Sequence, residues 1–128
     1  MKTREINPTT GVYLATRDYV HAMEVTGATR QLFVSGTMGL AEDGLAPASL
    51  DEQLELIWSN IQRILAEAEM SVSNIVRLTS YLARPEYAGR NQAAREKALS
   101  GRVVPTTAIV VTTLDPSWLV EVEVIAMS

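Results

Sequence analysis

The sequence predicts an α+β domain over residues 1–128, with a single mixed sheet and two helices on one of its faces. The order of the patterns is strands, helix, strand, helix and two strands, and crossovers of the usual hand place both helices on the same side. A strongly amphipathic helix at 49–70 and a last strand of alternating Val and Glu support this layering. With 47% hydrophobic residues in 128, the chain can bury one core.

The first half contains two strand patterns and the clearest helix. Residues 18–27 read as a strand that ends in a glycine turn, residues 30–40 as a second strand, and residues 41–47 as a loop. Ser49 followed by Glu52 matches a capping box at the start of a helix over 49–70. The apolar face of this helix consists of Leu54, Ile57, Trp58, Ile61, Ile64, Leu65 and Ala68.

The second half continues with a strand at 73–83, which Pro85 ends, and a shorter helix at 86–99. Residues 106–114 are β-branched and apolar, as in a strand covered on both faces. In the last strand, 118–128, the valines at 120, 122 and 124 face one way, and Glu121 and Glu123 face the other. The glutamate face meets either water or another subunit. Because residues 106–114 are apolar on both faces, part of that second face should be buried, and we expect an oligomer.

Composition excludes several classes of protein. The chain has no cysteine, which rules out disulfides and thiolate chemistry, and its one histidine is too few for a His-rich metal site. We find no run of about 18 apolar residues, no signal-peptide pattern and no basic stripe with interleaved aromatics. We therefore expect a cytoplasmic protein that binds neither nucleic acid nor membrane.

A few residues could carry chemistry. Glu121 and Glu123, at i and i+2 on one strand, lie roughly 7 Å apart and could serve acid–base catalysis at an interface, although a solvated strand face has the same pattern. Tyr19 and His21 could offer a hydroxyl and an imidazole to one cavity, or be structural. Ser35 and Gly36 could shape a site or simply a turn. No P-loop, nucleophile elbow or dinucleotide fingerprint is present.

The whole chain resembles the RidA/YjgF family of reactive-intermediate deaminases. The segments that carry the resemblance are "DYVHAMEVTG" with "LFVSGTMGL", similar to an early hairpin, "IQRILAEAEMSVSNIVRLTSYL", "VPTTAIVVTTL" and above all "VEVEVIA". The resemblance implies a chorismate-mutase-like fold and a homotrimer with a barrel-like core and clefts between subunits. It also implies cofactor- and metal-independent hydrolysis of an imine or enamine of a 2-amino acid to a 2-keto acid and ammonia.

Matched to the family motifs, Glu121 is the glutamate that orients or activates water, and Tyr19 is a second catalytic residue. Substrate-binding positions match Ser35, Gly36, Asn91, Thr107 and Ala108, with His21 as a further candidate. Two departures stand out. The family's substrate-carboxylate arginine, two positions after Pro105, is here Thr107, and Glu69 stands where glycine is commoner.

The missing arginine leaves three hypotheses open. The chain could hydrolyse an imine or enamine other than the usual small 2-imino acids, it could be a non-catalytic small-molecule-binding or regulatory trimer, or it could be a protein-interaction trimer. The first requires another cation at the cleft, for which Arg17, Arg77 and Arg102 are candidates, although all three could be surface charges. The sequence does not place them, and it does not say whether Glu123 is paired.

Overall fold

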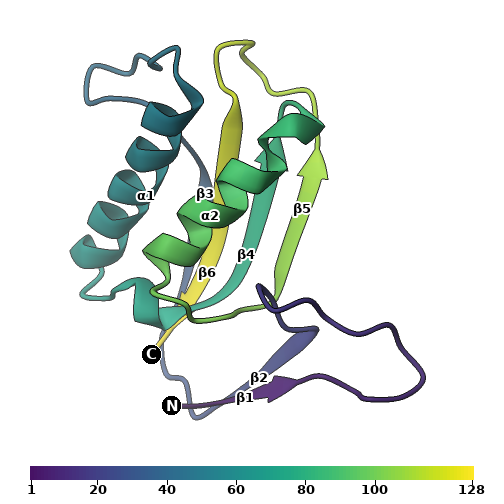
Figure 1. The fold of residues 1–128 in the computed structure, drawn as a ribbon. Helices are drawn as coiled ribbons and strands as arrows, with labels where there is room; N and C mark the ends of the chain where they lie inside the picture. The colour runs from purple at the N-terminus through teal and green to yellow at the C-terminus, as the bar shows by residue number, and fades with distance from the viewer.

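The computed structural model describes residues 1–128 and contains the predicted α+β architecture (Figure 1). Its main sheet has four strands in the order β3-β6-β4-β5, with β4 parallel to β5 and β6 antiparallel to both β3 and β4. The elements of this layer are β3 (Gln31–Met38), α1 (Leu50–Glu67), β4 (Ile75–Leu82), α2 (Ala88–Ala98), β5 (Thr106–Val110) and β6 (Val120–Met127). Short 3₁₀ turns at Val72–Asn74 and Pro85–Tyr87 precede β4 and α2.

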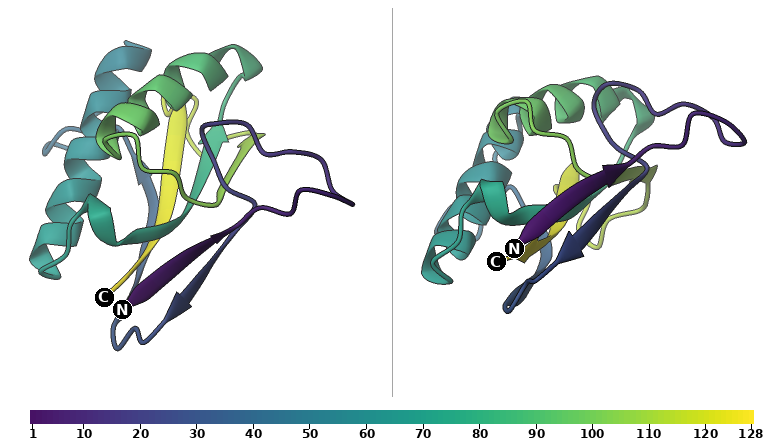
Figure 2. Two further views of the ribbon diagram at one scale, coloured as in Figure 1. Left: turned by 60° about the horizontal axis from the view of Figure 1, so that its bottom comes forward. Right: turned by 90° about the horizontal axis from the view of Figure 1, so that it is seen from below.

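Both helices cover one face of this sheet, as predicted (Figure 2). Val120, Val122 and Val124 of β6 are buried against them together with Leu54, Ile57, Ile61 and Leu65 of α1. Glu121 and Glu123 lie on the opposite face and are half-buried. The hydroxyl of Ser49 accepts a hydrogen bond from the amide of Glu52 at 3.3 Å, which confirms Ser49 as the N-cap of α1, but the return bond of the predicted capping box, from the Ser49 amide to the Glu52 side chain, is not formed.

The expectation of a single sheet needs a correction, because a separate two-stranded ribbon precedes the main sheet. β1 (Lys2–Ile6), which the sequence patterns did not indicate, pairs antiparallel with β2 (Ala22–Thr26). The early hairpin that the resemblance implied therefore joins β2 to β1 and not to β3. The ribbon lies at the end of the sheet where β4 and β5 begin, on the side away from the helices (Figure 2).

The predicted strand at 18–27 is also shorter than expected, because its first residues are held as a loop. Arg95 of α2 is 4% exposed and forms a salt bridge with Asp18 at 2.5 Å. The backbone amide of His21 bonds the side chain of Asn7, and Val20 makes an isolated parallel bridge to Pro105. These three contacts hold residues 18–21 in a loop, so the regular strand begins only at Ala22.

The strand predicted at 106–114 ends at Val110 and forms an edge of the sheet. Its residues Ala108, Ile109 and Val110 are exposed in the single chain, so neither face of its second half is covered. No helix is long and apolar enough to cross a membrane.

Glu69 has a left-handed backbone with φ of 56°, as its match to a commonly glycine position suggested. It lies in a Schellman motif, in which Glu69 N–H donates to Ala66 O and Met70 N–H to Leu65 O, both at 2.9 Å. We expect Glu69→Gly to raise the free energy of unfolding by about 1 kcal/mol, because glycine adopts this conformation without steric cost. Urea denaturation would measure this change in the free energy of unfolding. Glu67→Gly is the control, because a glycine within α1 should instead destabilise the protein.

Candidate functional site

Six polar side chains share the face of the sheet that the helices leave uncovered, and all are half-buried. Cross-strand pairing places Thr79 beside Thr107 on one side and Glu123 on the other, and Tyr81 beside Glu121. This open-face cluster consists of Arg77, Thr79 and Tyr81 on β4, Thr107 on β5, and Glu121 and Glu123 on β6. The cluster therefore runs across three strands of one sheet and combines a cation, two carboxylates and three hydroxyls.

Glu121 and Gly36, two of the residues that the resemblance named, lie against each other. The β3–β6 register shifts between Val34 and Thr37, so a bulge at Ser35 and Gly36 interrupts the ladder. A Cβ atom at Gly36 would lie 2.8 Å from Glu121 Oε2. Because Gly36 has no side chain, the Glu121 carboxylate can occupy this space.

If Glu121 has the water-activating role that the resemblance implies, Gly36→Ala should lower turnover by about tenfold or more without unfolding the protein. The new methyl group meets the mobile end of the Glu121 side chain, so the carboxylate must move while the backbone stays, and a small misplacement of a catalytic group is expensive in rate. The matched control is Gly39→Ala, whose Cβ would lie 2.4 Å from the backbone oxygen of Gln53. That variant should be strongly destabilised. Turnover and thermal unfolding of both variants check this, and equal stability losses would contradict it.

Arg77 donates a hydrogen bond from Nη2 to Thr107 Oγ1 at 2.8 Å. Thr107 is the position that the resemblance matched to the family's arginine, and the guanidinium of Arg77, on the neighbouring strand β4, contacts it. Arg77 forms no salt bridge and is half-buried, so its remaining donors are free to bind an anion. Among the three arginines considered from the sequence, Arg77 is the one that meets Thr107.

Tyr81 donates its hydroxyl to Glu123 Oε1 at 3.2 Å. This hydrogen bond, partial burial and the negative charges of Glu123 and Glu121 raise the pKa of Tyr81 above 10, while the charge of Arg77 opposes the shift. Glu123 is therefore paired, which the sequence left open. The pair fixes one carboxylate oxygen of Glu123 and leaves the other available.

Glu123→Gln should return the pKa of Tyr81 toward that of an ordinary tyrosine, because both the strongest acceptor and a negative charge are lost. A raised pKa in the folded state stabilises the fold below pH 10, and this contribution is lost as pH rises through the folded value. Ultraviolet titration of phenolate, with Tyr81→Phe to assign the signal, measures the shift. An unchanged titration curve in Glu123→Gln would show that the hydrogen bond has no influence.

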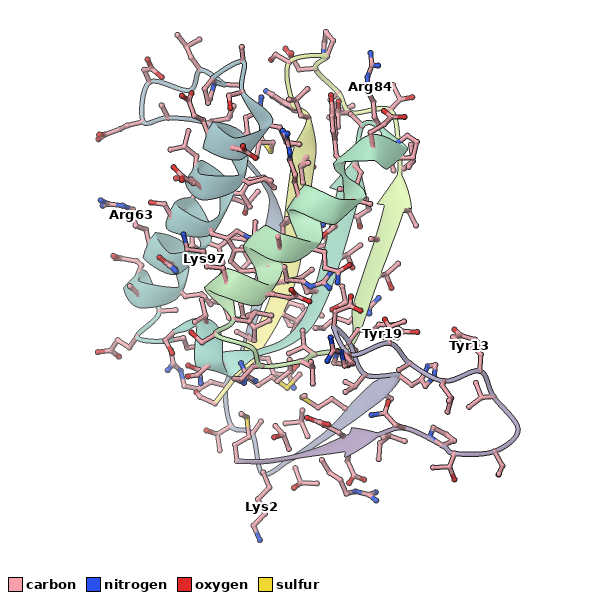
Figure 3. The ribbon with its side chains drawn as sticks, viewed as in Figure 1. Lys2, Tyr13, Tyr19, Arg63, Arg84 and Lys97 are labelled. Carbon is pink, nitrogen blue, oxygen red and sulfur yellow. The ribbon has the colours of Figure 1, made fainter.

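Tyr19 lies near the foot of β5 (Figure 3), and its neighbour Val20 forms a parallel bridge to Pro105, just before β5. The rings of Tyr19 and His21 pack edge to face with centroids 5.8 Å apart, and His21 Nε2 is 2.7 Å from the carbonyl oxygen of Tyr13. His21 and Arg77 line one cavity of about 390 Å³ with Pro105. A single chain therefore brings His21 and Arg77 to the same cavity. It does not join the two predicted catalytic residues, because no hydrogen bond connects Tyr19 with Glu121.

The other predicted residues lie outside the open-face cluster. Asn91 of α2 is buried among the helices with its Oδ1 unpaired, so it belongs to the opposite layer from Glu121. Ala108 alternates with Thr107 and faces the helical side of β5. Arg102 donates to the carbonyl groups of Val72 and Ile75, which is a structural role, and Arg17 is exposed.

Two features were missed from the sequence: Thr79 and Tyr81 as neighbours of the candidate Arg77, and the salt bridge of Arg95. Arg77, Thr79 and Tyr81 alternate within "IVRLTSYL", so the pattern could have identified Tyr81 as facing the same side as the glutamates. The partner of Arg95, by contrast, is Asp18, 77 residues away, and no local signal joins them. Arg95 fixes the loop that carries Tyr19.

Comparison with known proteins agrees with the geometry. The model of a family described as endoribonuclease L-PSP matches residues 10–128. A RutC family protein from Aquifex aeolicus is 38% identical over 65 residues, which is 50% of each chain. RutC family protein YjgH from Escherichia coli is 36% identical over 55 residues, 43% of this chain and 42% of that protein. The matches thus span about half or less of these curated relatives.

A crystal structure of a protein of unknown function from Yersinia pestis, YyfB of the conserved Rid protein family, superposes with a TM-score of 0.86. The two proteins are 25% identical, and the match covers 100% of both chains. The family model covers almost the whole sequence, and the crystal structure shares the fold over the whole chain. The chain therefore belongs to the endoribonuclease L-PSP family, which is the RidA/YjgF family.

Proposed function

We propose that this protein hydrolyses an imine or enamine of a 2-amino acid to a 2-keto acid and ammonia, with Arg77 in the role of the arginine absent at position 107. The observation that supports this most is the 2.8 Å hydrogen bond from Arg77 to Thr107. A guanidinium binds a carboxylate through two parallel hydrogen bonds, and Arg77 retains the donors to do so. Without this cation the open-face cluster would have no partner for a substrate carboxylate.

In this mechanism Glu121 orients and activates the attacking water. Water adds to the C=N carbon, the nitrogen is protonated, and collapse of the tetrahedral intermediate releases ammonia and leaves the C=O group of the keto acid. Glu121 takes a proton from the water and returns one to the departing nitrogen, which is acid–base chemistry that a single carboxylate can perform. Tyr19 and Ser35 stay candidates for contacts with the substrate.

The substrate should differ from the smallest 2-imino acids. Thr107 is shorter than the arginine it replaces, and the guanidinium now comes from β4, so the carboxylate lies nearer to the middle of the sheet. The space beside Arg77 is lined by Phe33 and Ile125. These features favour an imine with a larger apolar side chain.

The working form in this proposal is a cytoplasmic homotrimer with its sites between subunits. Gly36 and Glu121 lie on β3 and β6, whereas Tyr19 and Thr107 lie at β5, and β3 and β5 are opposite edges of the sheet. A head-to-tail ring would bring the β5 edge of one copy to the β3 edge of the next. Exposed Phe33 and Ile109 on the open face would be covered in the same assembly.

Subunit mixing tests this arrangement. Glu121→Gln and Arg77→Gln chains, each inactive alone, are coexpressed in equal amounts and assayed with imines generated in situ by an amino acid oxidase. If each site takes Glu121 from one copy and Arg77 from the next, about one quarter of the sites combine both intact residues and regain activity. Mixed trimers without activity would place both residues in one chain. A wild type that shows no turnover but is stabilised by ligand would favour the non-catalytic binder.

A further inference from the structure

The connection between β1 and β2, residues 7–21, contains no helix or strand and projects beyond the body of the molecule (Figure 2). Connections longer than about 12 residues usually have a function of their own. This projecting loop carries Val12, Tyr13 and Leu14, which are 39%, 73% and 73% exposed. Single exposed apolar side chains are normal, but three in succession form a contiguous patch, which indicates an interaction site.

Contacts within the chain hold the projecting loop in place. At its base, Asp18 forms the salt bridge with the buried Arg95. The ring of His21 packs edge to face against that of Tyr13 with centroids 4.9 Å apart, and His21 Nε2 lies 2.7 Å from the carbonyl oxygen of Tyr13. A loop fixed in this way loses little conformational entropy when it binds a partner.

A groove of about 660 Å³ lies at the opposite edge of the main sheet, between the edge strand β3 and α1. Its apolar lining includes Phe33, Leu40 and Ile64, and Phe33 is 70% exposed. Ser35 and Gly36, two candidate substrate-binding residues, line the same groove. The groove therefore adjoins the half of the candidate site that lies at β3.

The projecting loop of one chain does not reach the groove of the same chain. The loop lies beside the foot of β5 (Figure 1), and β5 and β3 are opposite edges of the sheet. Tyr13 on the loop and Arg63, which lines the groove, are on opposite sides of the molecule (Figure 3). An occupant of the groove must therefore come from another chain.

We propose that the projecting loop of one copy binds in the β3–α1 groove of the next copy, with Tyr13 and Leu14 against its apolar lining. This inference rests on the homotrimer of the proposed function, in which a head-to-tail ring brings the β5 edge of one copy to the β3 edge of the next. Tyr13 then lies beside Ser35 and Gly36 of the next copy. Each site thus includes a side chain from the neighbouring subunit that limits the size of the substrate.

Cysteine cross-linking tests this contact, because the chain has no cysteine of its own. Val12→Cys combined with Arg63→Cys places one thiol on the loop and one at the groove, and leaves Tyr13 and Leu14 intact. We expect a short bismaleimide to link most chains into covalent dimers and trimers on a denaturing gel. The matched control is Val12→Cys with Leu114→Cys, which should stay monomeric on the gel, because Leu114 is 94% exposed beyond the far end of β5.

Loss of the apolar contact should also weaken the assembly. Tyr13→Ser combined with Leu14→Ser is expected to raise the dissociation constant of the trimer by about tenfold or more, because burial of even one large apolar side chain has an effect of that size. Leu114→Ser, which also removes an exposed leucine, should leave the constant unchanged. Sedimentation over a range of protein concentrations measures all three proteins.

A trimer in which the Val12–Arg63 pair gives no cross-link, or in which both cysteine pairs cross-link equally, would overturn the docked loop and leave the proposed hydrolysis standing. A chain that stays monomeric at every concentration would contradict the docked loop together with the trimer. Specific cross-linking in a protein that hydrolyses no imine would support this inference and contradict only the proposed reaction.

Discussion

Glu121→Gln is expected to lower imine hydrolysis by at least about 100-fold, within the range that loss of a general acid–base group produces. Glutamine has the size of glutamate and can remain in the space over Gly36, but it cannot take a proton from water. The substrate should still bind, because its carboxylate interacts with Arg77. The loss should therefore be in kcat, with KM changed little.

The stability of this variant should stay within about 0.5 kcal/mol of wild type, since Glu121 is half-buried and has no salt bridge to lose. Thermal unfolding and stopped-flow hydrolysis on the same preparations separate the two effects. Glu24→Gln is the matched control, because it makes the same substitution on a strand outside the cluster and should keep full activity. If Glu121→Gln retained normal kcat, the water-activating role would have to be assigned elsewhere.

Arg77→Gln is expected to reduce kcat/KM by about 30- to several-thousand-fold. A desolvated pair between guanidinium and carboxylate typically loses about 2–5 kcal/mol when one partner is removed. Glutamine can still donate to Thr107 but has no charge and cannot form two parallel bonds to a carboxylate. The effect should be smaller for an imine whose carboxylate is esterified, because that substrate has no charge to pair.

Arg84→Gln provides the matched control for this second variant. Arg84 is exposed at the opposite end of the sheet (Figure 3). The Arg84→Gln variant has the same net charge as Arg77→Gln and should retain wild-type kcat/KM. A similar loss in both variants would point to long-range charge, and the role of Arg77 at the site would then be excluded.

The strongest local patterns were the ones that the sequence could predict. The capped, amphipathic helix at 49–70 became α1 within a few residues, and the alternation of valine and glutamate correctly assigned the two faces of β6. These signals are local, since a helical repeat or a strand alternation needs no knowledge of the partner. The resemblance named Glu121 and Gly36 as site residues, and the structure showed that they lie against each other.

The rest depended on contacts between residues far apart in the sequence. The pairing of β1 with β2 was not predicted, and the loop that the Arg95–Asp18 salt bridge holds shortens the strand expected at 18–27 to Ala22–Thr26. The place of Arg77 depended on the register of β4 with β5, and one residue of slip would have turned its side chain to the helical face. Composition and periodicity do not specify that register, so the sequence could name Arg77 as a candidate but not select it.

The most direct test of the account moves the arginine from β4 back to β5. Imines of several 2-amino acids, including 2-iminobutanoate and a leucine-derived imine, are generated in situ at fixed amino acid concentration, and the appearance of keto acid is followed for three proteins: wild type, Arg77→Gln, and Arg77→Gln combined with Thr107→Arg. We predict that wild type is active, best on the larger imine, that Arg77→Gln is nearly inactive, and that the double variant regains activity with a shift toward the smaller imine. An Arg77→Gln protein as active as wild type, or a wild type that acts on none of these imines, would contradict the claim that Arg77 supplies the missing cation.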